Sequence, residues 1–135
     1  MKEYFDKIYC INLSHRKDRW QESLIEFEKL GIANDVERFE AIQLQPGIIG
    51  CTASHYEIVK TAKSNNYKNV LIFEDDVKIL RDDSSNIISL TMQQIDKNNI
   101  PYDMLYLGGN LVGDENLAYR IDENLAKLHT CKTTA

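Results

Sequence analysis

The strongest constraint on the fold is an alternation, along most of the chain, between short apolar segments and longer segments of helical periodicity. The short segments are rich in β-branched and aromatic residues, as buried strands are, and lie at Lys7–Leu13, Val36–Ile42, Asn69–Phe73 and Asp103–Leu107. Between them, apolar residues recur three or four positions apart, which predicts helices over residues 16–30, 48–64 and 84–97. Helix-length connections between strands indicate parallel pairing. We therefore predict an α/β fold with a mainly parallel sheet covered by helices on both faces, whose neighbouring central strands are Ile8–Leu13, Val70–Phe73 and Met104–Leu107.

Beyond Gly109 the periodic signal is weaker. A short hairpin is predicted there, formed by Ala118–Ile121 and Leu125–Thr130. No repeat, low-complexity tract or linker divides the sequence. With 135 residues the chain is long enough to bury a sizeable core, so we interpret residues 1–135 as a single domain.

Composition narrows the classes of function. A formal net charge of -5 argues against a nucleic-acid partner, because binding to the phosphate backbone needs a basic face. No apolar run approaches the roughly 20 residues that span a bilayer, and acidic residues stand where a secretory leader would be apolar. Three cysteines without CxxC spacing fit free thiols in a reducing compartment. We therefore expect a cytoplasmic protein without a transmembrane segment.

Three consecutive acids, Glu74, Asp75 and Asp76, directly follow the most apolar strand. Ligands of open α/β sheets bind at the carboxyl ends of the strands. Alternation along an extended chain predicts that Glu74 and Asp76 share one face while Asp75 points to the other. Adjacent carboxylates repel one another unless a cation compensates, and an all-oxygen set suits Mg²⁺ or Mn²⁺. The alternative is a solvated acidic turn, which is weakened because Val77–Leu80 resumes an apolar pattern at once.

A polar segment, Asn12–Arg19, follows the first strand and opens the first helix. Arginines and backbone N–H groups at a strand-to-helix turn can hold a diphosphate. The segment has neither the P-loop pattern nor GxGxxG. A capped helix start with solvated charges is the alternative interpretation.

Small residues gather where the second helix starts, at Gly47–His55. They allow another backbone or a ligand to approach closely, and Ser54 and His55 supply polar groups. For His55 alone, a packed or surface histidine is the alternative. We interpret Cys51 as a small core residue in preference to a nucleophile.

Taken in order, these segments resemble glycosyltransferase family 25, which contains lipopolysaccharide and lipooligosaccharide galactosyltransferases and relatives that galactosylate collagen. The resemblance covers nearly the whole chain to Gly109. The residues that match the family are Ile11–Leu13 with Arg16, Asp18 and Arg19, then Arg38–Ala41, Gly50–Cys51, Ser54–His55, Val70–Val77 and Asp103–Gly108. No single segment is decisive, whereas the ordered set is specific. The family more often has Pro where this chain has Lys17.

The resemblance implies a GT-A-type, Rossmann-like fold, a UDP-sugar donor (often UDP-galactose), dependence on Mn²⁺ or Mg²⁺, and inversion at the anomeric carbon. Glu74, Asp75 and Asp76 resemble the family's version of the DxD motif, which binds the metal on the donor diphosphate. The expected donor contacts are Asn12, Arg16, Arg19, Ser54 and His55. The implied acceptor is a glycan, a lipid-linked glycan or a polypeptide, with peripheral membrane association.

The family's catalytic domain continues past the segment that Cys131–Ala135 resembles, so we expect the chain to be incomplete and assign no catalytic base. One alternative is therefore a non-catalytic nucleotide-sugar or metal-binding module, which would bind UDP without transferring sugar. A response-regulator receiver domain is disfavoured, because it would need its acidic pair after the first strand, where Asn12–Ser14 stands.

Overall fold

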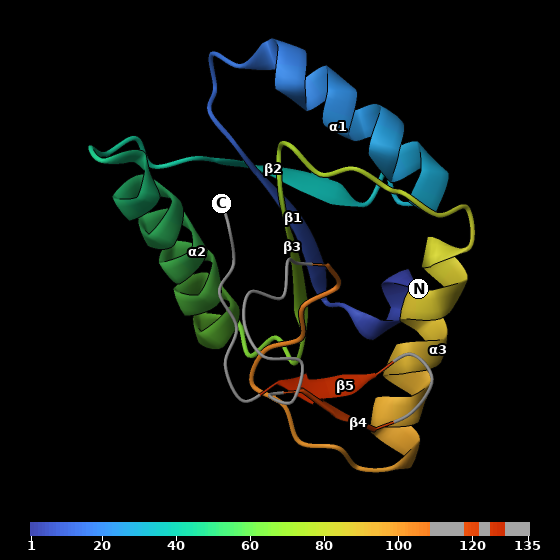
Figure 1. The fold of residues 1–135 in the computed structure, drawn as a ribbon. Coiled ribbons are helices and arrows are strands. Elements are labelled where there is room, and N and C mark those ends of the chain that lie inside the picture. The colour runs from blue at the N-terminus through green and yellow to red at the C-terminus, as the bar shows by residue number, and fades with distance from the viewer. Residues whose placement is uncertain (109–117, 122–124, 129–135) are drawn as a thin grey trace. The chain divides into compact units, whose positions relative to one another are not determined.

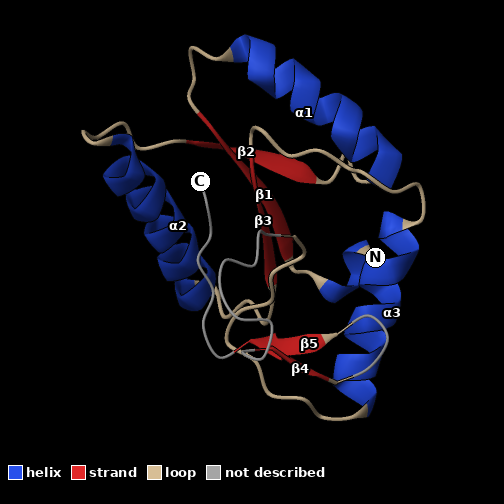
Figure 2. Cartoon of the chain, in the orientation of Figure 1, coloured by secondary structure: helices blue, strands red, loops and turns tan. Residues whose placement is uncertain are grey.

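A computed structural model describes residues 1–108, 118–121 and 125–128. The chain divides into two compact units, Met1–Ser85 and Asn86–Ala135. The elements, in chain order, are the 3₁₀ helix η1 (Lys2–Tyr4), β1 (Lys7–Asn12), α1 (Lys17–Leu30), β2 (Val36–Glu40), α2 (Gly47–Ser64), β3 (Val70–Glu74), α3 (Ser84–Lys97), β4 (Ala118–Arg120) and β5 (Ala126–Leu128) (Figure 2).

The first unit is built on a three-stranded parallel sheet with the strand order β2-β1-β3 (Figure 1). Its register pairs Cys10 with Arg38 on one side of β1 and with Phe73 on the other. Because all three strands run in one direction, their carboxyl ends share one edge of the sheet. The predicted α/β class and the pairing of the first strand with Val70–Phe73 are confirmed.

Helices cover both faces of this sheet, as predicted (Figure 1). Alternate residues of β1 point to opposite sides, so Ile8 and Cys10 pack with Phe27 of α1, whereas Tyr9 and Ile11 pack with Ile58 of α2. Phe27 and Ile58 are 0% and 1% exposed, and burying a side chain of this size stabilises the fold by about 1.5–3 kcal/mol. Apolar residues on both faces of one strand explain why β1 reads as a continuous apolar run.

Two glycines fix how the helices meet the rest of the unit. Gly31 ends α1 in the left-handed conformation, with φ 70°, and donates its N–H to Glu28. Gly50 of α2 lies against the chain that leaves β2: a Cβ there would stand 2.3 Å from the carbonyl oxygen of Ile42 and 3.0 Å from the nitrogen of Leu44. The small residue at Gly50 therefore lets another backbone, and not a ligand, come close.

One predicted strand is wrong. Asp103–Leu107 forms no strand, and Met104 and Leu107 are 67% and 42% exposed. A strand needs a neighbour that accepts and donates its backbone hydrogen bonds, and this segment has no such ladder among the described residues. The predicted hairpin is confirmed as antiparallel β4 and β5, although the end of its second arm, at Thr130, falls outside the described residues. In the described part of the chain, no helix combines the length and apolar character needed to cross a membrane.

Candidate functional site

The three acids after β3 diverge at the carboxyl edge of the sheet. Glu74 is the last residue of the strand and faces Cys51 and His55 of α2, whereas Asp75 turns to the opposite side. The prediction that these two neighbours point to opposite faces is therefore confirmed. Asp76, in the turn, is exposed and forms no hydrogen bond or ion pair with another described residue.

Asp75 holds this turn in place through hydrogen bonds to α1 and to Asn12. Its side chain is only 13% exposed, and Arg19 of α1 donates to its Oδ1 at 2.9 Å. Its Oδ2 accepts from Nδ2 of Asn12 at 2.6 Å. Ser23 adds a bond from its hydroxyl to the Asp75 carbonyl at 3.2 Å. These contacts hold the end of β3 against α1, so both carboxylate oxygens already have donors.

Asn12 connects all three strand ends. It is 1% exposed and its amide also donates to the carbonyl oxygen of Arg16 at 3.1 Å. Its own side-chain oxygen accepts from two guanidinium nitrogens of Arg38, with the Nε contact at 2.8 Å. Nη2 of Arg38 also donates to the carbonyl oxygens of Leu13 and Ser14 at 3.2 and 3.1 Å. Asn12 therefore joins the three strand ends through hydrogen bonds of its buried side chain. Its predicted contact with a nucleotide-sugar donor stays a prediction.

Arg16 lies on the solvent side of the same edge and pairs with Asp18 in a two-pronged contact of 2.7 and 2.9 Å. This hydrogen bond lowers the pKa of Asp18 to about 2. The side chains of Arg16 and Arg19 are 39% and 40% exposed, so each guanidinium reaches solvent. Two half-exposed arginines beside a strand-to-helix turn can bind an anion such as a diphosphate.

Ser54, in contrast, is 0% exposed. Its hydroxyl accepts from the backbone N–H of Ile42 and donates to the carbonyl oxygen of Gly50, both at 2.8 Å. Ser54 thus ties α2 to the segment after β2 at the place where Gly50 permits the close approach. The predicted contact of Ser54 with a ligand stays a prediction.

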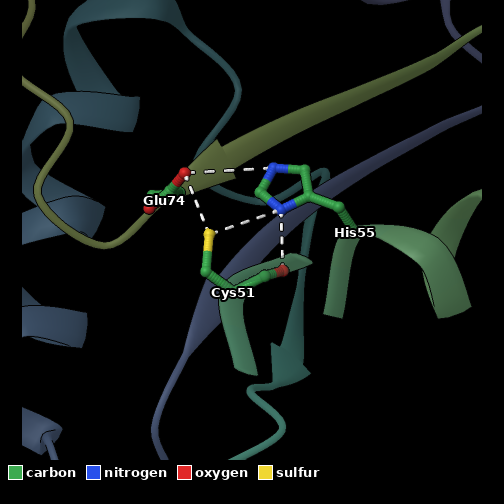
Figure 3. Close-up of side chains that lie close together, drawn as sticks. All are labelled: Cys51, His55 and Glu74. Atoms are coloured by element: carbon green, nitrogen blue, oxygen red, sulfur yellow. Dashed lines mark hydrogen bonds and ion pairs between the residues drawn. The ribbon is translucent and has the colours of Figure 1, made fainter. Parts of the chain in front are cut away.

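Cys51, His55 and Glu74 form a cluster on the α2 side of the edge (Figure 3). Sγ of Cys51 donates to Oε1 of Glu74 at 3.6 Å, and Nε2 of His55 lies 4.0 Å from the same oxygen. Nδ1 of His55 lies 3.1 Å from the carbonyl oxygen of Cys51. Burial, followed by the charge of Glu74, raises the pKa of the Cys51 thiol. Cys51 is half-buried, so the interpretation as a core residue does not describe it.

Two residues at this edge were not predicted from the sequence: Arg38, which binds Asn12, and Cys51, which was expected only to pack in the core. Both positions have a signal in the sequence. Arg38 is the single cation in the middle of the strand Val36–Glu40, and a cation that is partly buried in a sheet needs an acceptor. Cys51 and His55 are four residues apart and therefore share one face of a helix. What the sequence could not provide is the register that sets Arg38 beside Asn12.

Comparison with known proteins finds a matching family and several relatives. Residues 43–134 match the family described as glycosyltransferase family 25 (LPS biosynthesis protein). The chain is 26% identical over 140 residues to a protein of Bos taurus named "Probable inactive glycosyltransferase 25 family member 3", covering 84% of this chain and 23% of the relative. It is 28% identical over 130 residues to procollagen galactosyltransferase 2 of Mus musculus, covering 77% and 21%, respectively.

A glycosyltransferase 25 family member of Drosophila melanogaster is 27% identical over 139 residues, which cover 82% of this chain and 22% of the relative. The chain therefore spans less than a quarter of the length of these relatives. No solved structure matches the chain.

Proposed function

Because the chain belongs to glycosyltransferase family 25, we propose that it is the nucleotide-sugar-binding part of a metal-dependent galactosyltransferase. The observation that supports this most is the composition of the carboxyl edge of the sheet. The exposed Asp76 and the half-exposed Glu74 stand at the end of β3, while Arg16 and Arg19 reach solvent from the segment after β1. Carboxylates for a cation and arginines for phosphates are the two requirements of a nucleotide-diphosphate sugar.

The carboxylates fit Mn²⁺ or Mg²⁺, which take few protein oxygens and complete their shell with substrate phosphates and water. Glu74 and Asp76 would hold the ion, while Asp75 keeps the turn in place through Arg19 and Asn12. The bound metal would stabilise the charge on the leaving UDP as a Lewis acid.

The chain's own residues would bind and orient the donor. Arg16 and Arg19 would neutralise the diphosphate, and His55 would contact the donor from the first turns of α2. Donor binding would compete with the pairing of Arg16 and Asp18, because one guanidinium fork cannot serve both anions fully. We further propose UDP-galactose as the donor, inversion at the anomeric carbon, and a hydroxyl of a glycan, lipopolysaccharide or polypeptide as the acceptor. The base that deprotonates this hydroxyl is not assigned.

Titration calorimetry with UDP, with and without Mn²⁺, tests the proposal. We expect UDP to bind in the presence of Mn²⁺ and to bind more weakly after Arg16→Gln, which removes a charge proposed to face the diphosphate and leaves only the exposed Asp18 without its partner. Lys63→Gln is a matched control, because it removes a charge at the far end of α2. Absence of UDP binding under both conditions would contradict the proposed function.

A non-catalytic nucleotide-sugar-binding module is the second candidate, and one observation favours it: relatives at 26% and 24% identity carry the word "inactive" in their names. The two candidates differ in turnover. Release of UDP from UDP-galactose in the presence of Mn²⁺ and an acceptor glycan supports the transferase, whereas donor binding without UDP release supports the module.

A further inference from the structure

The proposed binding of a nucleotide sugar gives roles to His55 and Glu74 but none to Cys51, which forms a cluster with them. One ligand atom from each residue lies within 4.8 Å of the other two. The thiol and the imidazole lie on one face of α2, four residues apart, and the carboxylate reaches them from the end of β3 (Figure 3).

The separations suit a single small cation. Zinc bonds of about 2.0–2.3 Å in tetrahedral directions place neighbouring ligand atoms about 3.5 Å apart. In the structure Sγ of Cys51 lies 3.6 Å from Oε1 of Glu74, and Nε2 of His55 lies 4.0 Å from the same oxygen. All three ligand atoms lie within 4.8 Å of one another, so the side chains would draw closer together around a shared ion to reach this geometry.

The hydrogen bonding of His55 selects the nitrogen that would bind. A carbonyl oxygen only accepts, so the contact of 3.1 Å between Nδ1 and the carbonyl of Cys51 favours the tautomer that is protonated at Nδ1; Sγ of Cys51 lies farther from this nitrogen, at 3.8 Å. In a neutral ring Nε2 then presents its lone pair toward the Glu74 carboxylate, and two lone pairs face each other unless a proton or a cation lies between them. Donation of the other ring N–H to a backbone carbonyl is also the usual support of a histidine that binds a metal.

We propose that Cys51, His55 and Glu74 form a zinc-binding site, in which Sγ, Nε2 and Oε1 are the three protein ligands and a fourth position is open to water. A thiolate and an imidazole favour zinc over manganese or magnesium, which prefer oxygen ligands alone. The side chains of His55 and Glu74 are 38% and 41% exposed, so an ion can enter from solvent.

The zinc site stands independently of the proposed function, because zinc is measured without nucleotide. One consequence does rest on that function. Glu74 belongs to both metal sets, so zinc would withdraw it from the cation that accompanies UDP. We expect micromolar zinc to reduce Mn²⁺-dependent UDP binding.

Cobalt is the spectroscopic probe for the site. We expect the reduced 135-residue chain to bind one equivalent of Co²⁺ at neutral pH, with visible bands of a tetrahedral ion and a near-ultraviolet sulfur-to-cobalt charge-transfer band. Zinc should then displace the cobalt with the same stoichiometry. In Cys51→Ser the charge-transfer band should disappear, and zinc binding should weaken about 100-fold or more, because losing a direct ligand costs at least as much as losing its support.

Matched variants separate the site from other thiols and acids. Cys10→Ala should keep the charge-transfer band, because this thiol is 0% exposed and packs in the core with Phe27. Asp35→Asn should keep zinc affinity within about twofold, because Asp35 precedes β2 at the other end of the sheet and pairs with Lys2. His55→Gln offers a second removal if Cys51→Ser does not fold, and circular dichroism without metal checks folding in each case. A chain that binds cobalt without the charge-transfer band, or that binds zinc equally after both removals, would refute the site.

Discussion

The acidic turn after β3 contains two aspartates that the structure uses in opposite ways, and replacing each with asparagine distinguishes a structural acid from a functional one. Asp75 is 13% exposed and accepts from Arg19 and Asn12 through different oxygens, whereas Asp76 is exposed without a partner among the described residues. Asp75→Asn should therefore lower the free energy of unfolding, and Asp76→Asn should leave it unchanged.

The magnitude follows from the contacts of Asp75. An asparagine has one acceptor oxygen, so its NH₂ group would face one of the two donors, and that hydrogen bond would be lost. Hydrogen bonds to charged groups contribute about 1.5–3 kcal/mol, and Arg19, at 40% exposure, can recover part of its loss in water. We expect Asp75→Asn to cost about 2 kcal/mol, and Asp76→Asn less than about 0.5 kcal/mol, as is usual for surface substitutions.

Urea unfolding followed by the fluorescence of Trp20, the single tryptophan, measures both effects. A loss of about 2 kcal/mol lowers the midpoint by about 1 M urea when the slope is about 2 kcal/mol/M. Calorimetry on the same samples should show that Asp76→Asn weakens Mn²⁺-dependent binding of UDP. If Asp76→Asn instead lowers stability by more than Asp75→Asn and leaves UDP binding unchanged, the assignment of the two acids is reversed.

Three further predictions concern the packing of Gly50, the pH dependence of stability and the contact between Arg38 and Asn12. Gly50→Ala should lower the free energy of unfolding by about 2 kcal/mol, the overpacking penalty less the gain in helix propensity, because its Cβ would stand 2.3 Å from the carbonyl oxygen of Ile42. Gly47→Ala, with nothing within 4 Å, should not lower it in the same urea assay. Burial raises the pKa of Cys10 to about 12, so the native chain holds this proton more tightly than the unfolded chain. Stability should therefore fall as pH rises above about 8.5, and unfolding of Cys10→Ala should show a smaller fall. Arg38→Lys should cost about 1–2 kcal/mol in the urea assay, because an ammonium cannot reproduce the forked contact with Asn12, and an unchanged midpoint would argue against that contact.

The parts of the fold that the sequence predicted correctly are those determined by nearby residues. Apolar runs predicted β1 and β3, and helical spacing predicted α1 and α2. The pattern failed at Asp103–Leu107, where β-forming residues are present but no neighbouring strand is found in the part of the chain that the structure describes. Residue preferences describe how well a side chain suits a sheet, and they carry no information on whether a partner strand is within reach.

In the candidate site, too, the features set by neighbouring residues were predictable and those set by distant residues were not. Alternation along the chain was enough to predict that Glu74 and Asp75 diverge. The contacts that define the edge join residues far apart in sequence, such as Asn12 with Arg38 and Cys51 with Glu74, and they depend on strand order and helix placement. Ser54 is the clearest example, because its hydroxyl accepts from the N–H of Ile42 in the loop after β2 and donates to the carbonyl oxygen of Gly50 in α2, contacts that the sequence does not show.

The position of β1 at the centre of the sheet has a consequence for synthesis on the ribosome. Ile8 finds its partners in Val36 and Leu71, both of which are translated later. A nascent chain can pair β1 with β2 early, but the other side of the strand stays uncovered until β3 has emerged. Because domains fold as units during synthesis and exposed strand edges aggregate, a ribosome-bound chain that stops before Val70 should be a better chaperone substrate than one that extends beyond the β3 strand.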